Sequence, residues 1–159
     1  MTDDRISATR RIAAPAADIF AIVSDPRMHV EIDGSYMLVT APDGERLRAV
    51  GDSFSMDMDR DALGDRPLGR YSVLNVVTRI EPDRLLEWNV GNAERGPLGH
   101  VYGYELAPAA EGGTDVTSYC DWSAVSERVR ERVRFPVVPK MALLATLEKL
   151  DRLITRPAG

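Results

Sequence analysis

Two histidines, His29 and His100, are the side chains of this sequence best suited to move a proton near neutral pH. Neither stands in a recognisable catalytic motif, and neither has an acid or a nucleophile at a telling spacing. His29 falls in a predicted short surface helix, where we expect it to be solvated, and His100 begins a predicted strand. The sequence therefore assigns no catalytic residue, and we expect neither histidine to be one.

A run of alternating aspartates, Asp57, Asp59 and Asp61, imitates the start of a calcium-binding loop. Such a loop needs a glycine next and a bidentate glutamate at its last position, where this chain has Ala62 and Leu68. One cysteine and two isolated histidines do not make a zinc site. The glycine motifs that bind phosphates or dinucleotides are missing too. The sequence predicts no metal and no cofactor.

Four arginines alternate along the segment from Arg128 to Arg134. Such a basic cluster can attract an anionic ligand, a carrier protein or a membrane surface. Glu127 and Glu131 dilute its charge, so a solvated helix face is the favoured interpretation.

Composition sets the class of protein. The 159 residues, with 44% hydrophobic and 28% charged side chains, predict one globular domain over residues 1–159. A net charge of -5 argues against nucleic acid. The chain has no apolar run of the ~20 residues that a membrane span needs, and its acidic start does not resemble a signal peptide. The lone Cys120 fits a reducing compartment, so we expect a cytoplasmic protein without stable membrane insertion.

The elements that must position these side chains begin with a strand and two short helices. Ile6 to Ile12 alternates apolar and polar residues, the pattern of a half-buried strand. Pro15 starts a helix, which Ser24 to Pro26 ends, and Asp25 caps a second helix with Pro26 at its first position. Seven strand candidates in all predict an antiparallel meander with the helix pair inserted after the first strand. They are Ile6 to Ile12, Tyr36 to Thr40, Arg48 to Met58, Tyr71 to Ile80, Leu85 to Val90, His100 to Leu106 and Thr114 to Trp122.

The end of the chain is helical. Valines at every fourth position predict a narrow amphipathic helix from Ser123 to Arg134, which prolines then interrupt. A long helix follows from about Pro139 to Ile154. Its apolar stripe consists of Met141, Leu144, Leu147, Leu150 and Ile154, widened by Leu143 and Ala145.

Motifs throughout the chain resemble the START-like, or SRPBCC, superfamily, and more narrowly its bacterial polyketide cyclase/dehydrase-like branch. The matching positions are Ala14-Pro15, Ile19-Phe20, Ser24-Asp25-Pro26, His29, Asp33-Gly34, Gly51 to Met58, Glu81-Pro82, Glu87-Trp88, Tyr104 to Leu106, Thr114 to Thr117 and Asp121-Trp122. The resemblance implies an α+β helix-grip fold, in which a curved antiparallel sheet of about seven strands wraps around the long C-terminal helix and leaves an internal cavity.

The same resemblance implies which residues border that cavity. The candidate ligand-binding set is Asp33, Tyr36, Met56, Met58, Asn75, Trp88, Tyr102, Tyr104, Tyr119, Met141 and Leu144. Asp33 and one or more tyrosine hydroxyls are its expected polar points. Against this stands a packed core, because methionine and aromatic residues at strand spacing more often contact one another than a ligand.

Three classes of function follow. The first is binding of a small hydrophobic or amphipathic molecule, lipid or polyketide-like, in the cavity. The alternative is a polyketide aromatase/cyclase or dehydratase, which needs a placed acid or base that Asp33, His100, Tyr102 or Tyr104 would have to supply. The third is an interaction module without a ligand. The absence of a clear acid–base pair favours the binding protein, and the sequence is compatible with a homodimer.

Overall fold

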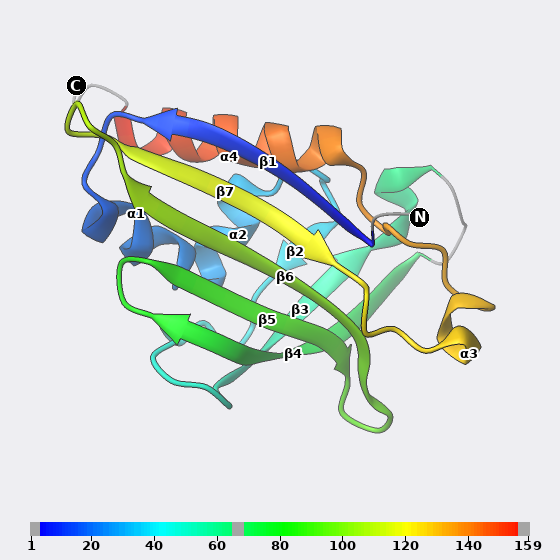
Figure 1. Cartoon of the computed structure of the whole chain (residues 1–159). Coiled ribbons are helices and arrows are strands. Elements are labelled where there is room, and N and C mark those ends of the chain that lie inside the picture. Colours follow the sequence, from blue (N-terminus) through cyan, green and yellow to red (C-terminus); the bar gives the residue numbers. More distant parts are fainter. Residues whose placement is uncertain (1–3, 65–68, 156–159) are drawn as a thin grey trace.

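The computed structural model describes residues 4–64 and 69–155, which form one strongly curved sheet with helices on its concave side (Figure 1). The strands are β1 (Arg5–Ile12), β2 (Leu38–Thr40), β3 (Ser53–Asp59), β4 (Arg70–Glu81), β5 (Leu85–Asn92), β6 (Gly96–Pro108) and β7 (Thr114–Asp121). The helices are α1 (Ala16–Val23), α2 (Pro26–Ile32), the 3-10 helix η1 (Arg60–Leu63), α3 (Glu127–Arg130) and α4 (Lys140–Thr155).

The seven strands lie in the order β1-β7-β6-β5-β4-β3-β2, and every neighbouring pair is antiparallel. The strands from β2 to β7 are neighbours in the order in which they follow along the chain, as a meander requires, and short turns join β4, β5, β6 and β7. The first strand crosses to the far edge and pairs with the last, with Ala8 opposite Ser118. Because a twisted sheet of this length curls, its concave face encloses space that the helices must fill.

Helix α4 covers the β1–β7–β6 part of the concave face. Leu147 and Leu150 are fully buried, and they belong to one core cluster with Ile12 and Val116 of the sheet. Burying a leucine side chain contributes roughly 1.5–3 kcal/mol, so this stripe anchors the helix. The predicted α+β architecture, a curled antiparallel sheet around a long C-terminal helix, is confirmed.

Helices α1 and α2 cover the other half of the concave face. The Asp25 carboxylate accepts the backbone N–H of Arg27 at 3.1 Å and caps α2, as the sequence indicates. Phe20 of α1 and Val30 of α2 pack against a second core cluster, in which Phe54 and Leu86 are buried. Two cores therefore lie side by side on one face.

Two of the predicted strands begin later than expected. The carboxylate of Asp52 accepts the backbone N–H groups of Arg48 and Ala49 at 2.8 and 2.9 Å. These bonds fold the chain into a turn, so β3 begins only at Ser53. Val50, which lies inside the predicted strand, is 64% exposed in that turn. Likewise β2 begins at Leu38 and excludes Tyr36, whose φ of 63° is incompatible with a strand.

The helix predicted from Ser123 to Arg134 is wrong in extent. Only α3 is helical, with the Ser126 hydroxyl capping the N–H of Val129 at 3.3 Å. From residue 131 to 139 the backbone is irregular and runs toward α4. The connection predicted at residues 91–99 is also shorter than expected, because β5 and β6 extend through most of it.

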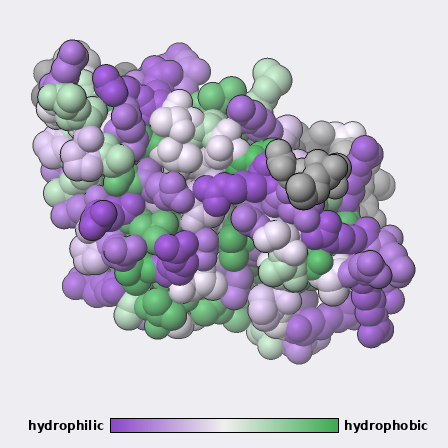
Figure 2. Space-filling model, in the orientation of Figure 1, coloured by the Kyte–Doolittle hydropathy of each residue, from purple (hydrophilic) through white to green (hydrophobic). Residues whose placement is uncertain are grey.

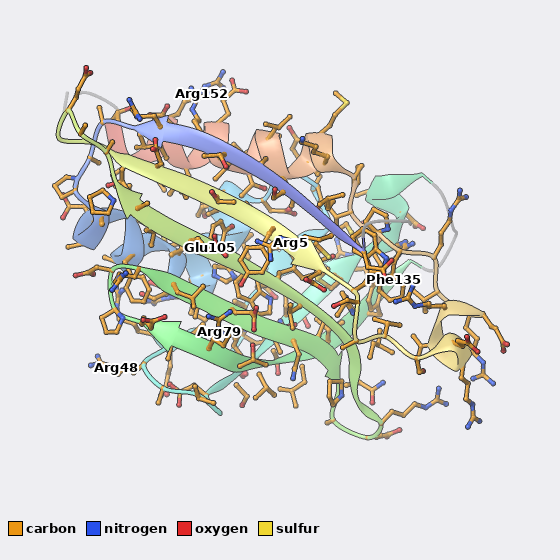
Figure 3. All side chains as sticks on the ribbon, in the orientation of Figure 1. Arg5, Arg48, Arg79, Glu105, Phe135 and Arg152 are labelled. Atoms are coloured by element: carbon orange, nitrogen blue, oxygen red, sulfur yellow. The ribbon has the colours of Figure 1, made fainter. Side chains whose placement is uncertain are left out.

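The convex face of the sheet is the one turned to the viewer in Figures 1 to 3. Figure 2 shows mainly hydrophilic side chains across it, with hydrophobic atoms gathered at the lower left. Its polar groups are paired: the hydroxyls of Thr9 and Thr117 lie 2.8 Å apart, and Arg11 donates to Asp115 at 2.9 Å. Arg5 donates to Glu105 at 3.4 Å, and both lie over the middle of the sheet (Figure 3).

Candidate functional site

A cavity of about 290 Å³ lies between the concave face of the sheet and the helices. Strands β3 to β6 form its floor, α2 and α4 form one side, and the segment 131–139 forms another. The side chains of this segment and of α4 that line the cavity are Val133, Val137, Val138, Leu143 and Thr146. Ligand pockets generally span ~300–1,000 Å³ and are mainly apolar. This cavity is at the small end of that range.

Trp88 stands at the centre of an aromatic wall. Its ring centroid lies 5.0 Å from that of His29, 5.9 Å from that of Tyr104 and 6.2 Å from that of Tyr102. The planes of these three rings are tilted from the indole plane by only 28° to 35°. Phe54 lies 6.1 Å from Trp88 in an edge-to-face arrangement. The rings therefore pack against one another and give the cavity an aromatic wall.

His29 is a wall of the cavity, not the solvated side chain predicted. It is 5% exposed, and its Nε2 lies 2.6 Å from the carbonyl oxygen of Val23, to which it donates. This bond assigns the proton to Nε2 and leaves Nδ1 as the acceptor of a neutral ring. Burial lowers the pKa of His29, with the Val23 carbonyl opposing it weakly. The imidazole is therefore neutral at physiological pH.

His100 lines the cavity near its other end, beside Tyr102 and Phe135. It is 3% exposed, and its Nδ1 has no hydrogen-bond partner among the described residues. Its ring meets Tyr102 edge-on at 5.6 Å and Phe135 at 4.9 Å. Figure 3 shows Phe135 at the end of the sheet, beside the start of β1. Burial lowers the pKa of His100 to about 4, so this ring is neutral as well.

Three further polar side chains on the concave face have no protein partner. Within residues 4–64 and 69–155, no hydrogen bond uses the side chain of Asn75, Tyr104 or Ser118. All three line the cavity and are 4%, 6% and 5% exposed. Burial raises the pKa of the Tyr104 hydroxyl, which stays a neutral donor. Among the described residues, His100 Nδ1 is the one fully buried side-chain polar atom without a partner, so the polar atoms of these three side chains reach the open space of the cavity.

Further polar groups lie near Tyr102. Burial raises the pKa of Tyr102, and the Cys120 thiol lies opposite it on β7. Burial also raises the pKa of that thiol to about 12, so Cys120 is not a nucleophile at neutral pH. Arg60, 7% exposed, brings a buried positive charge to the same side of the cavity.

Asp33 lines the cavity, but its carboxylate is already occupied. Its oxygens accept the N–H and hydroxyl of Ser35 at 2.8 and 2.7 Å and the N–H of Leu38 at 2.9 Å. The next residue, Gly34, presses against α4, where an added Cβ would overlap the Ala142 carbonyl. Asp33 therefore holds a turn at the cavity wall, and that it is a polar point for a ligand stays a prediction.

The structure brings most of the predicted site residues together. Those that line the cavity are Asp33, Met56, Met58, Asn75, Trp88, Tyr102 and Tyr104. Their strand positions explain this, because alternate residues share the concave face. That they contact a ligand stays a prediction.

Four predicted residues lie elsewhere. Met141 and Leu144 are 79% and 46% exposed, because α4 turns Leu143, Thr146 and Leu147 inward instead. Tyr36 is 70% exposed, and its ring packs under the Lys149 ammonium at 4.2 Å.

Tyr119 faces the opposite side of the sheet, since it alternates with Ser118 and Cys120 on β7. Its hydroxyl donates to Glu87 at 2.7 Å, and Arg5 lies 4.1 Å above its ring. It belongs to the convex face.

Sequence reasoning missed several residues that line the cavity, chiefly His29, Arg60 and Thr146. The i, i+4, i+7 spacing of Leu143, Leu147 and Leu150 was a usable signal for the inward face of α4. No local pattern marks His29 or Arg60, because each reaches the cavity from outside the strands.

The described residues contain neither a cluster suited to a metal ion nor a helix suited to cross a membrane. Among the described residues, no group of three or more His, Cys, Asp or Glu side chains is arranged to hold a metal ion. In the same part of the chain, no helix combines the length and the apolar character that crossing a membrane requires.

No family model matches the chain. The uncharacterized protein Rv0088 of Mycobacterium tuberculosis is 32% identical over 152 residues, which cover 92% of this chain and 62% of that protein. The chain thus spans 62% of the length of the curated relatives it matches.

Solved structures resemble the whole described chain. Protein MLL2253 of Mesorhizobium loti superimposes with a TM-score of 0.64 at 20% identity, over 98% of this chain and 99% of that one. The fold is the helix-grip fold. Truncated norcoclaurine synthase of Thalictrum flavum shares it, with a TM-score of 0.62 at 17% identity over 97% of this chain and 94% of that one. These similarities show the fold, while membership of the START-like/SRPBCC superfamily and of its polyketide cyclase/dehydrase branch stays a prediction.

Proposed function

We propose that this protein binds a small hydrophobic or amphipathic molecule in the cavity between sheet and α4. The observation that carries the proposal is the cavity itself, about 290 Å³ in volume and walled mostly by apolar and aromatic side chains. An apolar cavity of ~150 Å³ accepts benzene, so this one has room for a molecule of roughly twice that size. Burial of such a ligand's surface contributes roughly 25 cal/mol per Å² before ordering terms oppose it.

Several features support a ligand over a packed core. The aromatic rings leave space between themselves and the opposite wall, and buried polar groups point into it without protein partners. A ligand in the cavity would fill the empty space and give those polar groups hydrogen-bond partners. We propose a lipid-like or polyketide-like molecule as the occupant, and no nucleic acid partner, since the chain carries a net charge of -5.

Catalysis of a cyclisation or dehydration is the second candidate. One observation favours it: the neutral imidazole of His29 and the phenol of Tyr104 line the same cavity, with ring centroids 6.5 Å apart. A base and a hydrogen-bond donor at that separation suit removal of a proton next to a carbonyl group. The finding that would decide for it is a bound polyketide that loses one water on incubation.

A fluorescence titration with anilinonaphthalene sulfonate tests the binding proposal. Met58→Trp places an indole in the cavity, and we expect it to weaken binding at least tenfold. Met141→Trp is the matched control, because Met141 is 79% exposed and lies off the cavity. Equal weakening by both variants, or no binding by the unmodified protein, would contradict the proposal. Native mass spectrometry of protein from its own host would then identify a retained ligand.

A further inference from the structure

Asn75 and His100 lie on the same row of the concave face, two strands apart. Asn75 of β4 pairs with Val90 of β5. On β6, the register places the residues opposite Val90 between Pro97 and Val101, in the irregular stretch that holds His100. Neighbouring strands are about 4.8 Å apart, so the two backbones are about 10 Å apart across Val90.

The side chains of Asn75 and His100 are both buried polar groups of the cavity lining without a hydrogen-bond partner in the described part of the chain. Each is more than nine-tenths buried, each lines the cavity, and neither side chain takes part in a hydrogen bond within the described ranges. An amide offers both a donor and an acceptor, and so does a neutral imidazole. Their common complement is an uncharged oxygen, a hydroxyl or a carbonyl. A carboxylate would instead be drawn to Arg60, the buried cation of the lining.

The wall beside this pair is aromatic. The planes of Trp88 and Tyr102 are within 28° of each other on adjacent strands, and their ring centroids are 6.2 Å apart. Aromatic rings favour an aromatic, and therefore planar, ligand in edge or offset contact over a flexible chain, because a rigid ligand loses less conformational freedom on binding.

We propose that the ligand is a planar, fused-ring aromatic molecule with a neutral oxygen at each of two opposite edges, and that Asn75 and His100 each recognise one of those oxygens. This inference rests on the proposed function, since it names the class of molecule that the cavity binds. Two or three fused rings match the span of about 10 Å between the two strands.

Calorimetric titrations with three probes test this: dihydroxynaphthalene, naphthalene and decanoate. We expect dihydroxynaphthalene to bind at least tenfold more tightly than either of the others. Asn75→Leu and His100→Phe should each reduce that preference about tenfold, while naphthalene binds as before or more tightly. Naphthalene binding also shows that the cavity of each variant is intact, so either variant alone suffices.

The outcomes separate this inference from the proposed function. Equal binding of dihydroxynaphthalene and naphthalene, unchanged preference in both variants, or tightest binding of decanoate would overturn the planar oxygenated ligand while leaving a binding cavity. Failure of all three probes to bind would overturn both. Quenching of Trp88, checked against a Trp88→Phe variant that keeps only Trp122, places a bound probe at the wall.

Discussion

On the convex face of the sheet, polar side chains bind one another, whereas on the concave face several bind nothing within the described ranges. Glu87 shows the first case: one oxygen accepts the Tyr119 hydroxyl and the other accepts Thr78, both at 2.7 Å. Asn75, on the neighbouring strand, shows the second. The two faces share the same strands and the same register, and they differ in whether their polar side chains have hydrogen-bond partners.

This difference in hydrogen bonding suggests that the convex face serves the stability of the sheet and that the concave face serves the proposed binding. Paired groups on the convex face stabilise the sheet by themselves. Unpaired buried groups on the concave face lower stability, which a protein retains where binding needs them. The comparison therefore predicts that substitutions of opposite faces will affect stability in opposite directions.

The largest effect should come from a core substitution in α4, the helix that closes the concave side. Leu147→Ala is expected to lower the free energy of unfolding by about 2–5 kcal/mol, because Leu147 is fully buried in the core cluster. Leu144→Ala is the matched control on the same helix, at 46% exposure, and should change it by less than about 0.5 kcal/mol. Urea unfolding measures both. Similar losses in the two variants would show that α4 is rotated from its described position.

The two faces should also respond to acid in different pH windows. The pKa of His100 is about 4 in the folded chain, below its ordinary 6.5, so the unfolded chain binds more protons between these values. Stability contributed by neutral His100 is therefore present above pH 6.5 and lost as pH falls toward 4, by an amount on the order of 3 kcal/mol. Burial lowers the pKa of His29 and adds a loss of the same sign.

The convex-face carboxylate Asp115 acts only at lower pH. Hydrogen bonding to Arg11 lowers its pKa below 3.8, so its contribution is lost as pH falls below that value. Urea midpoints measured from pH 7 to pH 3 separate the windows. His100→Phe should flatten the curve between pH 6.5 and 4, and Asp115→Asn should not. An unchanged slope in His100→Phe would contradict the buried neutral histidine.

The smallest effect should be the most informative. Glu87→Leu leaves Tyr119 and Thr78 without their acceptor and is expected to destabilise by about 1–3 kcal/mol. Asn75→Leu removes an unpaired amide and should leave stability within about 0.5 kcal/mol or raise it. Thermal unfolding of the two leucine variants compares the faces directly. A loss for Asn75→Leu as large as for Glu87→Leu would mean that Asn75 is structural.

The sequence predicts the sheet well because alternation is a property of the extended backbone. Met56, Trp88 and Tyr104 had to share a face with their neighbours at i±2, and the structure places all three at the cavity. By contrast, α4 carries apolar residues around more than half of its circumference. Two overlapping apolar stripes therefore compete for the inward face, and the tertiary partners favour the one with Leu143 over the one with Met141.

Turn chemistry and pairing were harder to foresee. The Asp33 carboxylate is taken up by Ser35 and Leu38, a local arrangement that depends on the exact path of the chain. The unpaired state of Asn75 and His100 depends on which side chains the helices and the segment 131–139 bring across the cavity from distant parts of the sequence. A sequence pattern identifies such residues as polar and inward, but it does not state what they will or will not contact.

The pairing of β1 with β7 also has a consequence during synthesis. Their paired residues, such as Ile12 and Thr114, are more than 100 residues apart, so the first strand to leave the ribosome waits for the last. Until β7 emerges, Ile6, Ala8 and Ile12 have no strand beside them, and contacts of this separation form slowly. Helix α4 emerges later still. A nascent chain therefore has no enclosed cavity before α4 emerges, and the proposed ligand binding must follow, not accompany, translation of that helix.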